Sequence, residues 1–135
     1  MTRARIAALL PTAAAAYVVL NLFHVADHVR QGRVLSPGVT YPGTAVLIVA
    51  VALTVLAFRR SRVAAPLAVA FGAVTAIGLV AVHLVPAWGT FSDSYLPLRL
   101  DAVSWLSVLA LLAAGVAVGI CGVAALRARP TQAAG

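Results

Sequence analysis

Three histidines and three aspartates are the residues of this chain best suited to chemistry, and the densest group is the segment from His24 to His28. In a helix, residues four apart lie on one face, one turn above each other, so the imidazoles of His24 and His28 can point at a common centre. Imidazole nitrogens are frequent ligands of zinc, iron and copper. The segment therefore predicts two metal ligands, with Asp27 as a further ligand or as a carboxylate that fixes one imidazole tautomer. Tyr17 and Asn21 extend this polar stripe along the same helix.

His83 is the third histidine and completes a candidate metal set of His24, His28, His83 and Asp27. Three protein ligands are typical of an open transition-metal site, for zinc, iron or copper. A metal-dependent hydrolase or oxidase acting on lipid-soluble substrates would fit such a site. No motif in the chain names a reaction, and an HxxxH spacing also arises by chance.

Two other functions fit the same residues. His83 and one histidine of the first pair could be the axial ligands of a b-type haem in an electron-transfer protein. Its propionates would then meet Arg30, Arg33 or Arg99. Alternatively, the chain is a non-catalytic subunit in which the histidines are ordinary interface residues.

The three carboxylates are expected to differ in role. Asp27 stands near the C-terminal end of a helix, where the macrodipole disfavours an anion, so it should have a cationic partner such as Arg30, Arg99 or a metal. Asp101 immediately precedes an apolar run and is well placed to cap a helix. Asp93 lies between two serines and is expected to be a turn residue.

The elements that must position these residues are membrane spans. Of the 135 residues, 63% are hydrophobic and only 10% are charged, which is far from the composition of a soluble domain. Apolar segments near or above the length of a span predict transmembrane helices over about 6–28, 41–58, 63–85 and 102–126. Inside lipid each span must satisfy its own backbone hydrogen bonds, so continuous apolar runs favour helices. We expect one all-α domain over 1–135, a bundle of four transmembrane helices.

The arginines indicate how these helices are oriented. Ten arginines against three aspartates give a net charge of +7, and they stand in small groups between the apolar runs rather than along one nucleic-acid-binding face. Seven belong to one side of the membrane: Arg3, Arg5, Arg59, Arg60, Arg62, Arg127 and Arg129. The positive-inside rule then places both termini on the cytoplasmic side of a plasma membrane, of the bacterial inner-membrane type. Every histidine and carboxylate falls at the opposite, extracytoplasmic face.

The rest of the sequence narrows the choice of function. The membrane midplane holds nothing more polar than Thr54 and Thr75, which argues against a proton-coupled transporter or a channel. Cys121 is the only cysteine, so an internal disulfide and a thiolate-clustered zinc site are excluded. Gly115 and Gly119 form a GxxxG step, which predicts close helix packing within the chain, in a homodimer or in a larger membrane complex.

Overall fold

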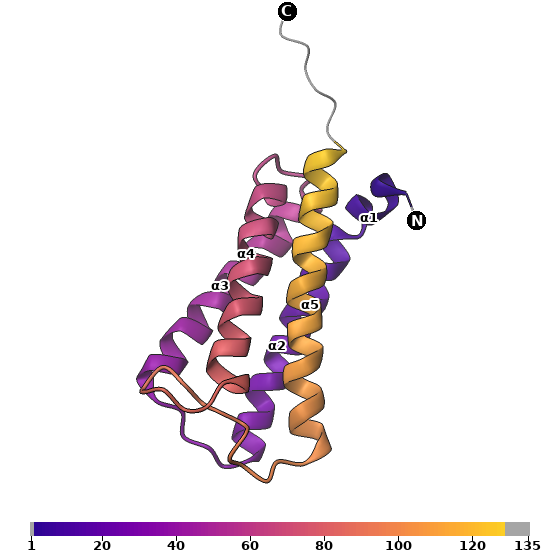
Figure 1. The fold of residues 1–135 in the computed structure, drawn as a ribbon. Coiled ribbons are helices and arrows are strands. Elements are labelled where there is room, and N and C mark those ends of the chain that lie inside the picture. Colours follow the sequence, from indigo (N-terminus) through magenta and orange to yellow (C-terminus); the bar gives the residue numbers. More distant parts are fainter. Residues whose placement is uncertain (1, 129–135) are drawn as a thin grey trace, which may run out of the picture.

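The computed structural model describes residues 2–128, which are helical with no strand in that range (Figure 1). The elements are α1 (Arg3–Ala8), α2 (Leu10–Arg30), α3 (Pro37–Phe58), α4 (Ala64–Leu79), the π-helical turn η1 (Val80–Leu84) and α5 (Ala102–Arg127). Four helices are long and apolar enough to cross a membrane: α2, α3, α4 continued by η1, and α5. The expected all-α class with four candidate spans is confirmed.

The helices run up and down, and the two long connections lie at the same end of the molecule (Figure 1). These connections are residues 31–36 and 85–101, whereas the short turn between α3 and α4 lies at the opposite end with α1. Helix α5 packs against α1, α2 and α4, and α3 packs against α2 and α4. The candidate site therefore has to be built at the end where the long connections meet.

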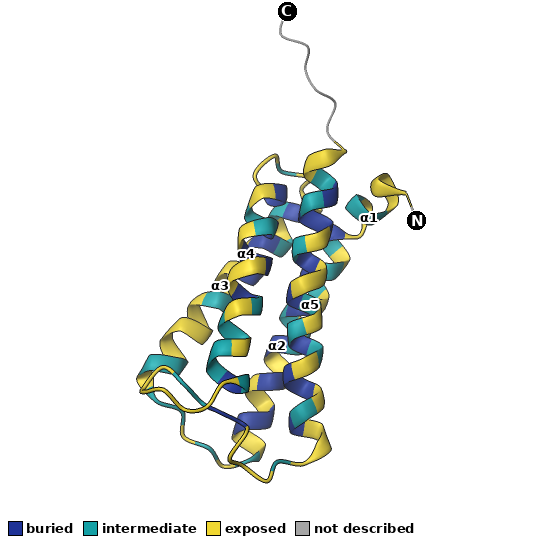
Figure 2. Ribbon diagram, viewed as in Figure 1, coloured by how far each residue is buried: buried dark blue, intermediate teal, exposed yellow. Residues whose placement is uncertain are grey.

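The buried core follows the seam between α2, α4 and α5 (Figure 2). Its members include Leu10, Ala14, Tyr17, Leu53, Ala68, Phe71, Leu111 and Val118. Helix α3 contributes buried residues only from its second half, which are Ala50, Leu53 and Ala57. The first half of α3 thus adds no buried residue to the core, although Val46 is partly buried against it and Gly38 lies close to Thr90.

Small residues bring α4 and α5 into backbone contact. A Cβ added at Gly72 would lie 2.6 Å from the Cα of Gly119, and one added at Gly115 would lie 2.8 Å from the Oγ1 of Thr75. The expected close packing through Gly115 and Gly119 therefore exists within the chain. Dimerisation through the same residues stays a prediction.

The helix boundaries differ from the sequence expectations at three places. The first long helix begins at Leu10 rather than at residue 6, because Pro11 starts a new helix and residues 3–8 form the separate α1. Helix α3 begins at Pro37, four residues before the expected start at residue 41. The third span ends in a π-helical turn over Val80–Leu84.

The end of α2 turns the chain back over the bundle. Gly32 has a φ of +64°, the left-handed conformation that glycine adopts without strain. The Gly32 N–H donates to Val29 and the Arg33 N–H donates to His28, which is a Schellman motif. The motif satisfies two helix-end carbonyls and brings Arg33 back towards the histidines.

Candidate metal centre

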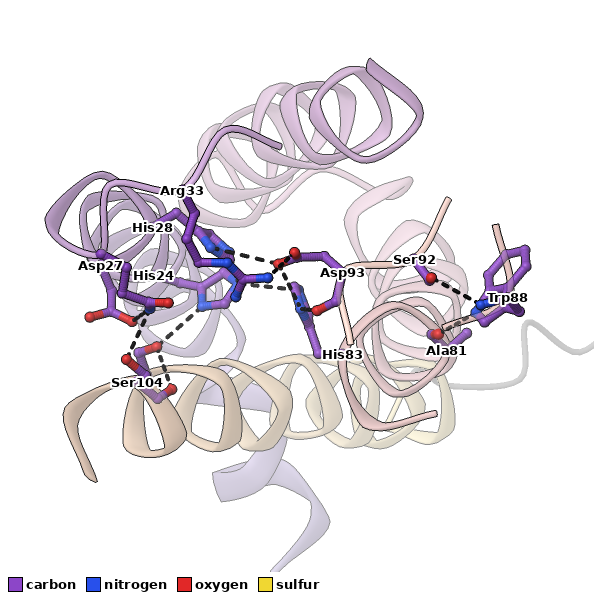
Figure 3. A network of polar contacts seen from close by, with 12 residues as sticks. His24, Asp27, His28, Arg33, Ala81, His83, Trp88, Ser92, Asp93 and Ser104 are labelled. Carbon is purple, nitrogen blue, oxygen red and sulfur yellow. Dashed lines mark hydrogen bonds and ion pairs between the residues drawn. The ribbon is translucent and has the colours of Figure 1, made fainter. Parts of the chain in front are cut away.

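The three histidines converge at one point although His83 lies 59 residues from His24. The Nε2 atom of His24 lies 3.2 Å from the Nε2 of His28 and 3.3 Å from the Nε2 of His83. One ring nitrogen from each histidine lies within 4.8 Å of those from the other two. All three side chains are buried, with at most 5% of each exposed. Figure 3 shows the imidazoles directed at a common centre.

Local backbone structure explains why these rings meet. His24 and His28 stand one turn apart on the inner face of α2. His83 belongs to η1, and single π-helical turns of this kind are frequent at functional sites. The carbonyls of Val82 and His83 accept the backbone N–H groups of Asp93 and Tyr95, each at 2.9 Å. The long connection before α5 thus closes the end of the third span and is held beside its histidine.

Hydrogen-bond partners assign the tautomer of two histidines. The Nδ1 of His83 lies 3.1 Å from the backbone carbonyl oxygen of Asp93, which can only accept, so Nδ1 carries the proton. The Nδ1 of His24 lies 3.2 Å from the Oγ of Ser107. Ser107 already donates its hydroxyl proton to the carbonyl of Ser104 at 2.8 Å, so His24 must donate to it. In the neutral rings, the Nε2 atoms of His24 and His83 therefore face each other with bare lone pairs.

His28 differs from the other two histidines, because its Nδ1 has no hydrogen-bond partner and the Oδ2 of Asp93 is 3.7 Å away. A neutral His28 can therefore carry its proton on Nε2 and donate it to the bare Nε2 of His24 at 3.2 Å. That bond leaves the 3.3 Å contact between His24 and His83 without a proton. A metal ion bound to all three nitrogens, with the proton of His28 on the Nδ1 that faces Asp93, would satisfy both contacts.

The nitrogen spacing matches that of a metal site. Two imidazole nitrogens bound to a tetrahedral zinc at about 2.0–2.1 Å lie roughly 3.3–3.4 Å apart. The separations of the His24 Nε2 from those of His28 and His83, 3.2 and 3.3 Å, agree with this value. The third pair, between His28 and His83, is known only to lie within 4.8 Å, so one of these two rings would turn inward to complete a tetrahedral set.

Asp93 is a residue of the histidine cluster that sequence reasoning missed. Its Oδ2 lies 3.6 Å from the Nδ1 of His83 and 3.7 Å from the Nδ1 of His28, and its Oδ1 is paired with Arg33. The expectation that Asp93 is only a turn residue is wrong, because residues 92–94 are not in a turn and the carboxylate points into the cluster. The one signal for this position was the restriction of every carboxylate to one face of the membrane.

Tyr95 and Arg33 cover the histidines on the loop side. Tyr95 is fully buried, and its ring centroid lies 4.8 Å from that of His83 and 5.7 Å from that of Trp105. The guanidinium carbon of Arg33 lies 5.4 Å from the centre of the Tyr95 ring. Burial raises the pKa of Tyr95 to about 12, so its hydroxyl stays protonated at neutral pH.

Asp27 has a different place from the histidines. Its Oδ1 accepts from the Nε of Arg30 at 2.8 Å and its Oδ2 accepts from Gln31 at 2.5 Å, on the side of α2 that faces Ser104 of α5 (Figure 3). The expected cationic partner of Asp27 is therefore Arg30. The structure brings His24, His28 and His83 together and leaves Asp27 outside that set.

Arg30 links this carboxylate to the start of α5. It also donates to Asp101 at 2.9 Å, and Asp101 caps α5 by accepting the N–H of Ser104 at 3.0 Å, as the sequence predicted. The hydrogen bond from Arg30 and that from Ser104 lower the pKa of Asp101 to about 2. This network fixes α2 against α5 at the level where His24 meets Ser107.

A cavity of about 510 Å³ adjoins the histidines between α2, α3 and α4. Its lining includes Tyr17, Asn21 and the three histidines on one side and mainly apolar residues of α3 and α4 on the other. Its size is within the range that holds a drug-sized ligand.

Comparison of the chain with protein families, with curated proteins and with solved structures finds no match in any of the three. The function therefore has to be inferred from the site itself.

Proposed function

We propose that this chain is a multi-pass plasma-membrane protein that binds one transition-metal ion through the Nε2 atoms of His24, His28 and His83. The observation that carries the proposal is the meeting of three buried Nε2 atoms at 3.2 and 3.3 Å, where those of His24 and His83 face each other with bare lone pairs. Bare nitrogens at this distance repel one another unless a cation lies between them.

The groups behind the rings support this assignment. Metal-bound histidines usually donate their second N–H to a carbonyl or a carboxylate, which fixes ring orientation and raises ligand basicity. His83 donates to the carbonyl of Asp93, and His24 donates to Ser107. The Asp93 carboxylate lies beside two of the rings, where it would stabilise the positive charge of an ion.

Three imidazole ligands leave a fourth position for water or substrate in a tetrahedral site. An ion there would activate a bound water or polarise a substrate oxygen. If the protein is a hydrolase or an oxidase, its lipid-soluble substrate would react at this fourth ligand position. Neutral imidazoles suit zinc, copper and iron alike. We would test zinc first, because two of the nitrogen separations match those at a tetrahedral zinc.

The geometry favours a small ion over a b-type haem. The plane of a haem would have to pass between its two axial imidazoles, but the rings of His24 and His83 have centroids only 5.0 Å apart at an interplanar angle of 82°. Of the expected propionate partners Arg30, Arg33 and Arg99, the first two are already paired with aspartates. A non-catalytic subunit would have no need for three buried histidines with converging nitrogens.

Metal analysis of protein purified in mild detergent tests the proposal. We expect about one ion per chain in the wild type, and loss of that ion in His24→Ala, His28→Ala and His83→Ala with helix content unchanged by circular dichroism. Cobalt substitution should give the intense visible bands of a tetrahedral site. Equal metal content in the wild type and all three variants would contradict the proposal, and a Soret band would replace it with the haem alternative.

The orientation is a separate part of the proposal, and it is supported by the arginine distribution. Reporters inserted after Arg62 should behave as cytoplasmic, and reporters in residues 31–36 or 86–100 as extracytoplasmic. A fusion after Arg129, which lies outside the described residues, should also be cytoplasmic. A loop reporter found inside would move the histidine end to the cytoplasm without dispersing the cluster.

A further inference from the structure

The cavity beside the histidines has walls that reach the apolar flank of the bundle. Val25 of α2 and Val74 of α4 line it and are 48% and 64% exposed on the outside of the helices. Thr40, Gly43 and Thr44 in the exposed first half of α3 form the facing wall. A molecule dissolved among the lipid chains could therefore enter between the helices without crossing a polar barrier.

The polar atoms in the cavity indicate what kind of head group it would take. Asn21 is 7% exposed and lines the cavity, and its side-chain carbonyl oxygen has no hydrogen-bond partner. Thr75, deeper in the cavity, already donates its hydroxyl proton to the carbonyl of Phe71 at 2.8 Å. Both oxygens can accept a hydrogen bond, and the Tyr17 hydroxyl beside them can donate to only one. One acceptor is therefore left for a ligand that donates a hydrogen bond.

The charge of the residues that line the cavity further limits the class of ligand. No arginine, lysine, aspartate or glutamate is among the described residues that line the cavity. Arg33, the nearest arginine to the histidines that the contacts show, is paired with Asp93. The chain itself offers an anionic phospholipid head group no arginine or lysine in this cavity, which favours an uncharged ligand.

We infer that the cavity binds an uncharged lipid-soluble alcohol, with its hydroxyl donating to the side-chain oxygen of Asn21 and its apolar chain lying between α3 and α4. Asn21 precedes His24 by three residues on the same face of α2, so the hydroxyl would lie beside the histidines. An alcohol oxygen that donates its proton keeps lone pairs for a metal ion. This last role depends on the proposed metal centre, whereas binding itself does not.

Photolabelling in phosphatidylcholine nanodiscs tests the inference. The probe is 1-hexadecanol with a diazirine at mid-chain, and the matched probe is the same molecule without the hydroxyl group. We expect the alcohol to label Val46, Leu47 and Leu79 saturably, with competition by unlabelled 1-hexadecanol and at least about tenfold better than the alkane, since an unpaired buried acceptor costs about 1–3 kcal/mol. Equal labelling by the two probes, or labelling spread over all exposed helix faces, would overturn the inference.

Variants separate the cavity from the general membrane surface. Asn21→Leu should remove the advantage of the alcohol over the alkane. Gly78→Leu should block both probes, because Gly78 lines the cavity and a Cβ there meets nothing within 4 Å. Ala70→Leu on the exposed face of the same helix should leave labelling unchanged. Labelling that persists in Gly78→Leu would show that the probe does not enter the cavity.

Metal content distinguishes failure of this inference from failure of the proposed function. Saturable, Asn21-dependent labelling of a protein that holds no metal would support the cavity and contradict the metal centre. Normal metal binding with non-saturable labelling would contradict the cavity and leave the metal centre intact.

Discussion

The backbone carbonyl of Asp93 accepts the Nδ1 proton of His83 at 3.1 Å, and the carboxylate of the same aspartate lies beside His28. One loop residue thus orients imidazoles from two different spans. The carbonyl fixes the tautomer of His83, and the carboxylate supplies negative charge next to both rings. The connection before α5 is therefore part of the site and not merely a link between helices.

Asp93→Asn should weaken zinc binding by about 10- to 100-fold, the usual effect of losing a partner behind a metal-bound histidine. The matched carboxylate variant is Asp27→Asn, which should bind zinc close to the wild-type level because Asp27 pairs with Arg30 outside the histidine set. Competition titration with a chromogenic chelator measures both affinities. An Asp27 variant weakened as much as the Asp93 variant would make Asp27 a member of the site.

Ser107→Ala should also lower zinc affinity, by about 10-fold or more, because His24 would lose the acceptor that fixes its tautomer. Ser94 provides the control, since its hydroxyl is buried without a hydrogen-bond partner. Ser94→Ala should therefore leave affinity unchanged. The same chelator titration measures the zinc affinity of both variants. An unchanged affinity in Ser107→Ala would show that Ser107 does not fix the tautomer of His24.

Two glycines of α4 should respond oppositely to alanine. Gly72→Ala should destabilise the bundle by about 1–3 kcal/mol, because the new Cβ meets the backbone of α5 at 2.6 Å. Gly78→Ala should be neutral or stabilise by up to about 1 kcal/mol, since its Cβ meets nothing and alanine favours helix. Unfolding in mixed micelles, followed by circular dichroism, gives the two values. Similar values for the two variants would mean that α4 and α5 separate easily.

Asp101 should contribute to the stability of the bundle only while it is ionised. Its pKa in the folded protein is about 2, below the value of about 3.9 for an unfolded chain. The contribution is therefore fully present above about pH 4 and is lost as the pH falls towards 2. Thermal unfolding of Asp101→Asn should show a weaker pH dependence than the wild type between pH 4 and 2. Identical profiles would mean that the bond from Arg30 does not stabilise the fold.

The sequence alone determined the helical class and most of what the site contains. Continuous apolar runs of spanning length admit only helices, because an unsatisfied backbone group in lipid is too costly. The four-residue spacing of His24 and His28 placed both rings on one face, and Asp101 before an apolar run predicted a cap. The dipole argument for Asp27 required a cation, and Arg30 three residues later is that cation.

Tertiary structure alone decided which of these residues meet. His83 points towards the other two histidines because it lies in a π-helical turn, and the spacing of apolar residues does not predict such a turn. Asp93 and Tyr95 join the histidines because their backbone N–H groups satisfy the open carbonyls at the end of that turn. Ser107 meets His24 because the contact of α4 with α5 and the Arg30 network fix how α5 faces α2. Such contacts join residues more than ten positions apart, so local sequence patterns cannot predict them.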